Sequence, residues 1–288
     1  MKRIFTLYFF ALFCLISQAQ EELYERVYVH TDKTCYLAGE EVWIKFYTTD
    51  THFQPSFFSK VGYVEISNAE RPQAQLKLAL DNGSGSGKIK IPADAPSGIY
   101  ELSGYTQYMR NEGEKIFFRK QIAIINTFRI AESDPITLAD STETYPKEVP
   151  AMNGNIRINT SRPSYSMRQP VELTINGLPE EVSDLIVSVS RNDSLVILPH
   201  HEESVWRQQV TSTPGTFSGQ WVPEYEGHII RGQIQTPEGE TLKQIQNKHV
   251  SADIAFVGKD IRYVQGQVDV EGNARFYTSN IFGINDIV

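Results

Sequence analysis

Cysteine is too scarce in this sequence to support a disulfide-stabilised fold. The 288 residues include two cysteines, Cys14 and Cys35. Cys14 lies in a segment that we expect to be removed on export, which leaves Cys35 as the one thiol of the mature chain. Folding must therefore rest on buried apolar surface, and a hydrophobic content of 40% is enough to form a core. No base neighbours Cys35 in a motif, so a buried side chain is favoured over a reactive thiol.

Positive charge is also in short supply. Lys and Arg number 27 against 35 Asp and Glu, which gives a formal net charge of −8. Removal of residues 1–19 would take away Lys2 and Arg3, two positive charges, and leave −10. Binding to a phosphate backbone or to an anionic lipid surface needs a basic patch. We therefore expect neither a nucleic acid partner nor a peripheral grip on anionic lipid.

Long apolar runs are missing after the N-terminus. Lys2-Arg3 precedes an almost wholly apolar run over residues 4–16, and Ser17-Gln18-Ala19 follows with small residues where a signal peptidase reads them. This pattern predicts a signal peptide over residues 1–19, cleaved after Ala19. A membrane anchor is the less favoured alternative, because a span needs about 20 apolar residues. We expect an exported protein without a transmembrane span after cleavage, in the periplasm, associated with the outer membrane or on the cell surface.

Motifs for catalysis, cofactors or metals are lacking. His200-His201-Glu202-Glu203 is the most metal-like cluster, but adjacent histidines on a strand point to opposite faces, so a solvated loop is favoured over an ion site. Residues 81–87 offer one carboxylate, which favours a hairpin over a calcium loop. The sequence has no G-x-S-x-G elbow and no phosphate loop. Asp32 lies near His30, and we interpret the two as a pair at the end of a strand rather than as part of a catalytic triad. We predict a non-enzymatic protein with no catalytic residues, cofactor or metal.

What the sequence does have is short alternating runs punctuated by turn residues, with almost no helical periodicity. Val42, Ile44 and Phe46, for example, alternate with polar or aromatic neighbours. Such runs are typical of sandwiches rather than of βαβ sheets. We predict an all-β fold of tandem immunoglobulin/fibronectin-like antiparallel β-sandwiches.

Composition divides the chain into three units. Residues 133–152 hold three prolines among polar and acidic residues, which is typical of a linker. We place a first sandwich at 21–130, the linker at 131–152, a second sandwich at 153–223 and a third unit at 225–288. The third unit is short for a sandwich, which usually needs about 70 to 100 residues. Two interpretations of the third unit remain open: a complete small unit, or a truncated part of a larger one.

An internal repeat links the first two units. Residues 27–46 align with residues 156–175 without a gap, at a constant offset of 129. Apolar positions coincide at both ends of a turn, and Thr31, Lys33 and Tyr36 meet Thr160, Arg162 and Tyr165. We interpret the two segments as equivalent hairpins of two related sandwiches. The second sandwich is expected to continue through a strand over residues 185–190.

Residues 26–46 also resemble the start of MG2 domains in the α2-macroglobulin family. The shared pattern is a strand, then Thr31-Asp32-Lys33, an aromatic at Tyr36, Gly39-Glu40 and a second apolar strand. The chain is most similar to long envelope proteins of Bacteroidetes-type bacteria, in which a carboxypeptidase-regulatory-like domain follows. The unit that begins at Ile229-Ile230-Arg231-Gly232 resembles that transthyretin-like module.

The resemblance implies a binding or scaffold module in the cell envelope, with protein partners for which outer-membrane receptors and proteases are the candidates. The chain departs from the family in two respects. The internal thioester of protease traps needs a CGEQ motif, whereas Cys35 is followed by Tyr36-Leu37. A trap also needs many macroglobulin domains around a bait region, and this sequence has about two. A macroglobulin-type endopeptidase inhibitor without a thioester is one alternative function. A carbohydrate-binding envelope module is the other.

Several aromatic residues are not placed by strand alternation, and among these Phe57, Phe58 and Tyr108 are the candidate binding residues. An exposed aromatic loop at the end of a sandwich would suit a protein or a glycan. The favoured alternative is that one of the adjacent phenylalanines packs inward while the other covers a domain joint.

Overall fold

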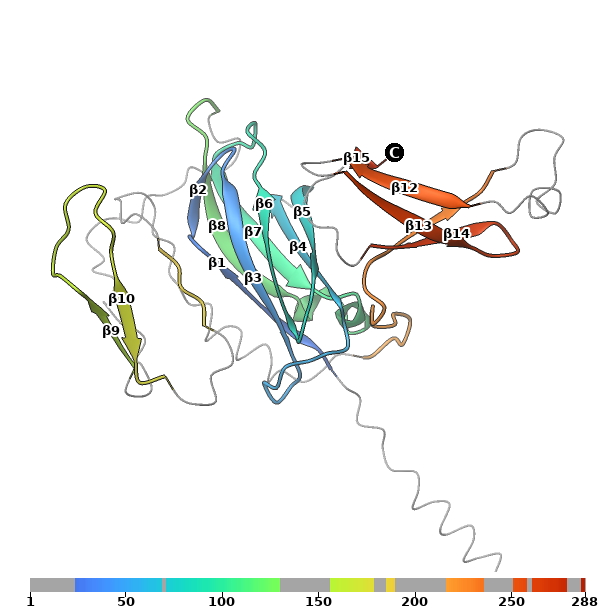
Figure 1. Ribbon diagram of the computed structural model, residues 1–288, viewed down its shortest axis with the longest axis horizontal. Helices are drawn as coiled ribbons and strands as arrows, with labels where there is room; N and C mark the ends of the chain where they lie inside the picture. Colours follow the sequence, from blue (N-terminus) through green and yellow to red (C-terminus); the bar gives the residue numbers. More distant parts are fainter. Residues whose placement is uncertain are drawn as a thin grey trace, which may run out of the picture.

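The computed structural model describes residues 24–68, 71–129, 156–178, 185–189, 216–235, 251–257, 261–278 and 286–287. The regular elements of these residues are β-strands, apart from two short 3₁₀ helices, and they pair almost entirely in antiparallel fashion (Figure 1). The predicted all-β sandwich class is confirmed. Among the described residues no helix is long and apolar enough to cross a membrane. The predicted signal and linker lie outside the described residues.

The first unit is a sandwich of two sheets. One sheet has the order β1 (Arg26–Thr31), β3 (Glu41–Thr49) and β6 (Ser84–Lys90). The other has the order β2 (Cys35–Leu37), β8 (Phe118–Ile125), β7 (Gly98–Tyr105), β4 (Val61–Asn68) and β5 (Arg71–Ala79). All pairs are antiparallel except β2 with β8. The helices η1 (Tyr108–Asn111) and η2 (Glu114–Ile116) join β7 to β8.

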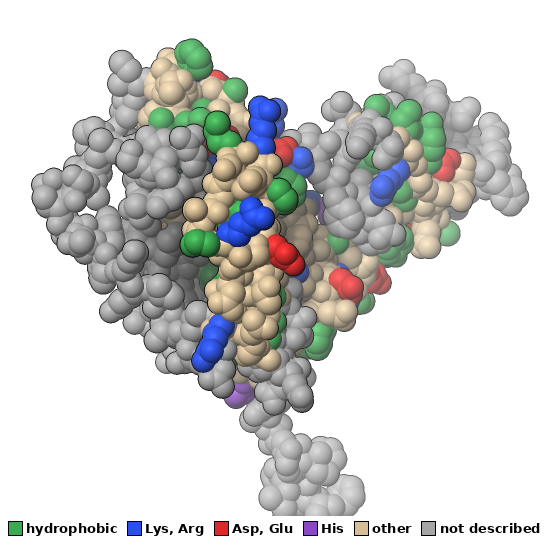
Figure 2. Space-filling model, turned by 60° about the vertical axis from the view of Figure 1, so that its left-hand side comes forward, with side chains coloured by type: hydrophobic (Ala, Val, Ile, Leu, Met, Phe, Trp, Pro, Cys, Tyr) green, Lys and Arg blue, Asp and Glu red, His purple; other side chains and the backbone are tan. Residues whose placement is uncertain are grey.

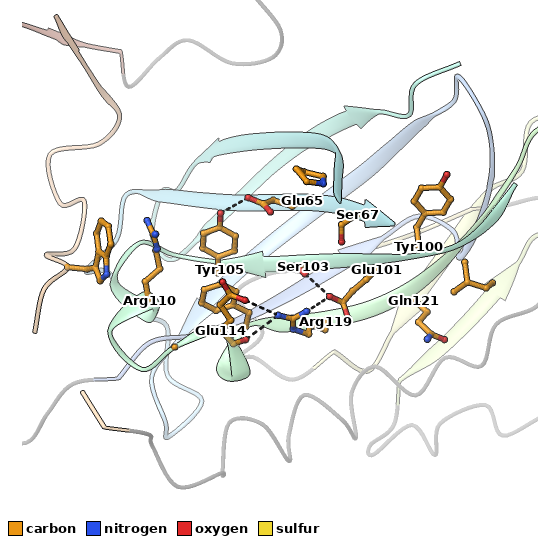
Figure 3. A pocket seen from close by; sticks show the side chains of 15 residues that line it. Glu65, Ser67, Tyr100, Glu101, Ser103, Tyr105, Arg110, Glu114, Arg119 and Gln121 are labelled. Atoms are coloured by element: carbon orange, nitrogen blue, oxygen red, sulfur yellow. Dashed lines mark hydrogen bonds and ion pairs between the residues drawn. The ribbon is translucent and has the colours of Figure 1, made fainter. Parts of the chain in front are cut away.

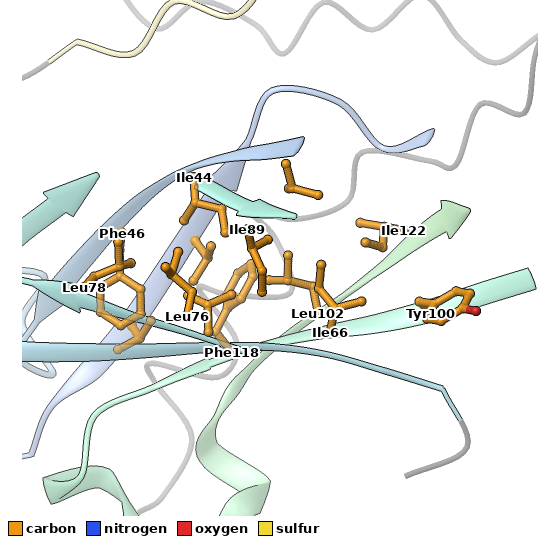
Figure 4. Close-up of a cluster of buried hydrophobic side chains, with 14 of the residues drawn as sticks. Ile44, Phe46, Ile66, Leu76, Leu78, Ile89, Tyr100, Leu102, Phe118 and Ile122 are labelled. Carbon is orange, nitrogen blue, oxygen red and sulfur yellow. The ribbon is translucent and has the colours of Figure 1, made fainter. Parts of the chain in front are cut away.

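Strand alternation builds the core between these two sheets. In β3 every second residue from Val42 to Thr48 is buried, as expected for a period of two residues. Phe46 of β3, Leu102 of β7 and Ile122 of β8 belong to one apolar cluster between the sheets, and all three have no exposed area (Figure 4). The opposite face of each strand is left for solvent or ligands.

The repeat predicted at an offset of 129 is present as a second hairpin, β9 (Arg157–Thr160) with β10 (Leu173–Asn176). Thr31 pairs with Ile44 in the first hairpin, and Thr160 pairs with Leu173 in the second. The positions shift by 129 on both strands, so the register is the same. This confirms the repeat for the hairpin itself.

The two hairpin turns also share their hydrogen bonds. The Tyr36 hydroxyl accepts a hydrogen bond from the Lys33 amide at 3.0 Å, and the Tyr165 hydroxyl accepts one from the Arg162 amide at 3.0 Å. Gly39 has a φ of +88°, and the equivalent Arg168 has a φ of +63°. Arginine in the left-handed region costs about 1 kcal/mol, so the second turn is formed at a cost that the first avoids. Two further pairs of hydrogen bonds match. The Thr31 hydroxyl donates to the Lys33 carbonyl, as the Thr160 hydroxyl does to the Arg162 carbonyl. The Leu37 amide donates to the Glu40 side chain, as the Ser166 amide does to the Gln169 side chain.

The segment 185–189, predicted as a strand, does not pair as a strand with any described residue. It lies against the outer face of the β1-β3-β6 sheet, where the Ser188 hydroxyl is 2.7 Å from His30 Nε2. The strand prediction is therefore wrong for these residues. Their apolar side chains fit a strand, but no neighbouring described segment offers backbone groups to pair with.

The third unit contributes one sheet to the described structure. Its order is β11 (Ile229–Gln233), β14 (Asn273–Tyr277), β13 (Arg262–Val268), β12 (Ala252–Val257) and β15 (Asp286–Ile287), all antiparallel. Phe256 and Phe276 are buried on one face. Gly266 lies under the Phe276 ring, where an added Cβ would approach a ring atom to 2.5 Å.

Candidate binding groove

In the first sandwich, the outer face of the β2-β8-β7-β4-β5 sheet carries a groove of about 1010 Å³ (Figure 3). Its floor consists of every second residue of these strands. Because the residues between them face the core, the floor residues point outward and many of them are polar. Glu65 of β4, Ser103 and Tyr105 of β7 and Arg119 of β8 lie along it. We call it the sheet groove. It is lined by Glu65, Ser67, Pro72, Ile99, Tyr100, Glu101, Ser103, Tyr105, Arg110, Gly113, Glu114, Phe117, Arg119, Gln121 and Trp221.

Three aromatic rings form a stack at one end of the sheet groove. The rings of Tyr63 and Tyr105 are 5.3 Å apart with an interplanar angle of 10°, and Tyr105 and Phe117 are 4.4 Å apart at 11°. Burial raises the pKa of Tyr105 above its ordinary value, and the hydrogen bond to Glu65 adds to the effect. The hydroxyl therefore remains a donor, at 2.6 Å from Glu65 Oε1.

The charged groups of the groove are largely paired with each other. Arg119 Nη1 donates to Glu101 and its Nη2 lies 4.0 Å from Glu114 Oε2. Arg110 lies at the far end of the groove from Gln121 (Figure 3). Charges of both signs are interspersed over the described surface in view as well, rather than gathered by sign (Figure 2). The groove therefore presents a mixed polar surface, with three carboxylates and two guanidinium groups.

A segment distant in sequence closes the end of the groove at which Arg110 lies. Residues 216–228, which we call the strap, lead into β11 and cross the first sandwich. The Asn111 side chain accepts a hydrogen bond from the Trp221 amide at 2.8 Å and donates one to the Trp221 carbonyl at 2.7 Å. The Arg110 guanidinium carbon lies 3.8 Å from the centroid of the Trp221 ring. The strap thus supplies one wall of the groove.

The strap is attached a second time at Glu224. Its carboxylate accepts a hydrogen bond from the Tyr63 hydroxyl at 2.9 Å, and its carbonyl accepts one from the Lys60 amide at 2.9 Å. Burial raises the pKa of Glu224 above its ordinary value, while the Tyr63 hydrogen bond and Lys77 oppose that rise. Burial and the Glu224 charge in turn raise the pKa of Tyr63.

The predicted aromatic residues do not form one surface. Phe57 is 56% exposed, whereas the Phe58 ring lies 6.4 Å from Tyr108, which in turn lies 5.5 Å from Phe217 of the strap. Phe58 and Tyr108 therefore pack where the strap meets the sandwich. Phe58 thus covers a joint, as the favoured alternative expected for one of the pair, whereas Phe57 is exposed and does not pack inward.

Asp32, which lies near His30 in the sequence, has a structural role in the hairpin turn. Asp32 Oδ1 accepts hydrogen bonds from the Tyr36 hydroxyl and the Trp43 amide, at 2.8 and 3.1 Å. The carboxylate thus closes the hairpin turn. Within the described ranges no group of three or more His, Cys, Asp or Glu residues could hold a metal ion. The cluster at 200–203 lies outside the residues described.

Comparisons with known proteins return distant structural matches. An alpha-2-macroglobulin of Salmonella, reacted with methylamine, matches with a TM-score of 0.30 and 10% identity, over 53% of this chain and 8% of that chain. The native conformation of E. coli alpha-2-macroglobulin matches with a TM-score of 0.30 and 10% identity, over 36% and 6%. The chain thus spans less than a tenth of the length of these proteins. No family model matches the chain, and no curated protein matches it either.

Sequence reasoning missed the groove residues that matter most. Alternation along β4, β7 and β8 identifies the outward residues, but polar outward residues are expected on any solvated sheet face. Trp221 is one of the aromatic residues that alternation does not place, and its contact with Arg110 spans 111 positions of sequence. Nothing local in the sequence signals that contact.

Proposed function

We propose that this chain is an exported, non-catalytic binding module of the cell envelope, which holds a protein partner along the sheet groove. The observation that carries the proposal is the groove itself: about 1010 Å³ of space over paired charges and aromatic edges. Protein interfaces combine aromatic and Arg side chains with hydrogen-bonding groups in this way. The predicted signal peptide and the MG2 resemblance of residues 26–46 support the envelope assignment.

The aromatic stack favours a protein over a glycan. A sugar ring packs on the open face of an aromatic side chain. Tyr105 is stacked between Tyr63 and Phe117, so both of its faces are covered, and one face of Trp221 is covered by Arg110. The groove therefore offers ring edges and hydroxyl groups, which suit peptide groups and side chains better than pyranose faces.

The test is capture from envelope extract by residues 20–288, compared between three forms. Gln121→Trp places a bulky side chain on the exposed β8 position that lines the groove. Asp94→Trp places the same side chain on an exposed loop outside it. We expect wild type and Asp94→Trp to retain the same partner and Gln121→Trp to lose it. Equal capture by all three forms would show that the groove is not the binding site.

An endopeptidase inhibitor is a second candidate, favoured by the sequence resemblance of residues 26–46 alone. Its bait segment would have to lie within residues 133–152, the one candidate that the sequence offers. Proteases that cut there and stay bound and inactive would support inhibition. Proteases that cut there and remain fully active would rule it out.

A further inference from the structure

Arg110 differs from Arg26 and Arg119, the arginines of the first sandwich that form ion pairs. Arg26 forms a buried pair with Glu112 at 2.7 Å, and Arg119 is paired with Glu101. The Arg110 guanidinium contacts Trp221 and has no hydrogen bond or ion pair with any residue that the structure describes. It is an exposed residue, so its N–H groups are accessible.

The contact with Trp221 orients the guanidinium without using its donors. A guanidinium stacked on an aromatic ring keeps its in-plane N–H groups open, and stacking reduces the freedom that it would lose on binding. At 3.8 Å the Arg110 group is in direct contact with the indole ring. The Asn111 side chain holds the Trp221 backbone through two hydrogen bonds, which anchors the part of the strap that carries the ring beside Arg110.

Neighbouring carboxylates already have other partners. Glu65 accepts hydrogen bonds from Tyr105 and Gln75, at 2.6 and 3.1 Å, and Glu101 is held by Arg119. The positive charge of Arg110 nevertheless acts on the groove, since it opposes the burial that raises the pKa of both Tyr63 and Tyr105. An oriented cation without an internal counter-ion is a recognition group for an anion on the ligand.

We infer that Arg110, held on Trp221, binds an Asp or Glu side chain of an extended peptide that lies in the sheet groove. The inference rests on the proposed function of the groove. A carboxylate matches the planar fork of the guanidinium. The three carboxylates that line the groove would repel the second charge of a phosphate group more strongly than a single carboxylate. The same carboxylates should favour neutral or basic residues at the other peptide positions.

The experiment selects binders from a displayed library of random ten-residue peptides, using residues 20–288 as the target. Variants Arg110→Gln and Arg110→Lys are compared with Arg71→Gln, which changes an exposed arginine of β5 outside the groove. Gln121→Trp reports whether selected peptides occupy the groove. Circular dichroism and thermal melting establish that each variant is folded.

We expect wild type and Arg71→Gln to enrich peptides with Asp or Glu at one fixed position, and Arg110→Gln to lose that preference. For a synthetic peptide from the selection, Arg110→Gln or an Asp→Asn change in the peptide should weaken binding about tenfold to a hundredfold. The two changes together should weaken it no further, as expected for groups that contact each other. Arg110→Lys should recover only part of the affinity.

The outcomes separate the inference from the function on which it rests. Peptides that need an open groove but carry no acidic preference would overturn the role of Arg110 and leave the groove as a binding site. An acidic preference that persists in Arg110→Gln would do the same. If no selected peptide is sensitive to Gln121→Trp, the proposed function of the groove itself is overturned.

Discussion

The N-terminal edge of the first sandwich places two charged side chains where most proteins place apolar ones. Arg26 and Glu112 are 1% and 2% exposed and form a bidentate pair at 2.7 and 2.9 Å. Next to them Glu25 is fully buried and accepts hydrogen bonds from Ser56, Ser59 and Thr106. Burial of this kind is stable only when each charge has its partner, because removing one leaves the other desolvated and unpaired.

Glu112→Gln should therefore lower the free energy of unfolding of the first sandwich by about 3 to 5 kcal/mol. The matched control is Glu41→Gln, because Glu41 pairs with Lys88 at 2.7 Å while the two side chains are 40% and 51% exposed. An exposed pair contributes about 0 to 1 kcal/mol. Urea denaturation measures both changes. Similar losses from the two substitutions would contradict the difference that burial predicts.

The hairpin is the element that the two units share. Tyr36 is 1% exposed and its hydroxyl joins Asp32 and Lys33 across the turn. Burial, with the neighbouring carboxylate of Asp32, raises the pKa of Tyr36 well above its ordinary value, so the hydroxyl stays a donor. The equivalent Tyr165 makes the same contact with Arg162 in a more exposed turn.

Removing each hydroxyl should reveal this difference in burial. Tyr36→Phe leaves the Lys33 amide without its hydroxyl partner and the Asp32 carboxylate with the Trp43 amide alone, next to a buried ring, and should cost about 1 to 3 kcal/mol. Tyr165→Phe should cost about 0.5 kcal/mol, because water can replace the hydroxyl. Native-state hydrogen exchange at the amides of Asp32 and Ser161 measures the two turns separately, since both keep their strand acceptors. Equal changes at both amides would contradict the prediction.

The hairpin was predictable from sequence because its determinants are local. Alternation places Val29 and Phe46 inside, and a polar turn residue and an aromatic recur at the same spacing in both copies. The strap was not predictable, since Trp221 and Asn111 meet across 110 positions. The strand prediction for residues 185–189 was wrong for a related reason. The apolar pattern of these residues fits a strand, but a strand also needs a neighbouring segment to pair with, and the pattern does not identify one.

At the scale of the whole molecule, the strap connects the first sandwich to the third unit. It is attached at Asn111 and at Tyr63, and it then enters β11 directly. At that junction Lys77 of β5 lies 3.0 Å from His228 Nε2, and His228 Nδ1 lies 2.6 Å from the Thr278 hydroxyl. Because the Thr278 hydroxyl donates to the His228 carbonyl, the ring N–H is on Nδ1 and Nε2 accepts from Lys77.

The junction should therefore weaken in acid. Burial, together with the charge of Lys77, lowers the pKa of His228 below its ordinary value of 6.5. A lowered pKa means that the folded form binds the proton less tightly than the unfolded form. The stability that neutral His228 contributes is thus present above pH 6.5 and is lost as the pH falls through the lowered value. Glu224, whose pKa is raised, has the opposite sign, and its contribution is lost as the pH rises.

His228→Gln separates these two effects, because the amide can accept from Lys77 but does not titrate. When the pH is lowered from about 7.5 to 5.5, the Thr278 amide, which bonds to the His228 carbonyl, should lose protection in wild type, seen as an increase in exchange relative to the intrinsic rate. The variant should show no such increase after correction for intrinsic exchange, and Glu224 should make its junction slightly more protected in acid. His52→Gln, in an exposed loop, should behave as wild type does. If His228→Gln loses protection in acid as wild type does, another group controls the junction.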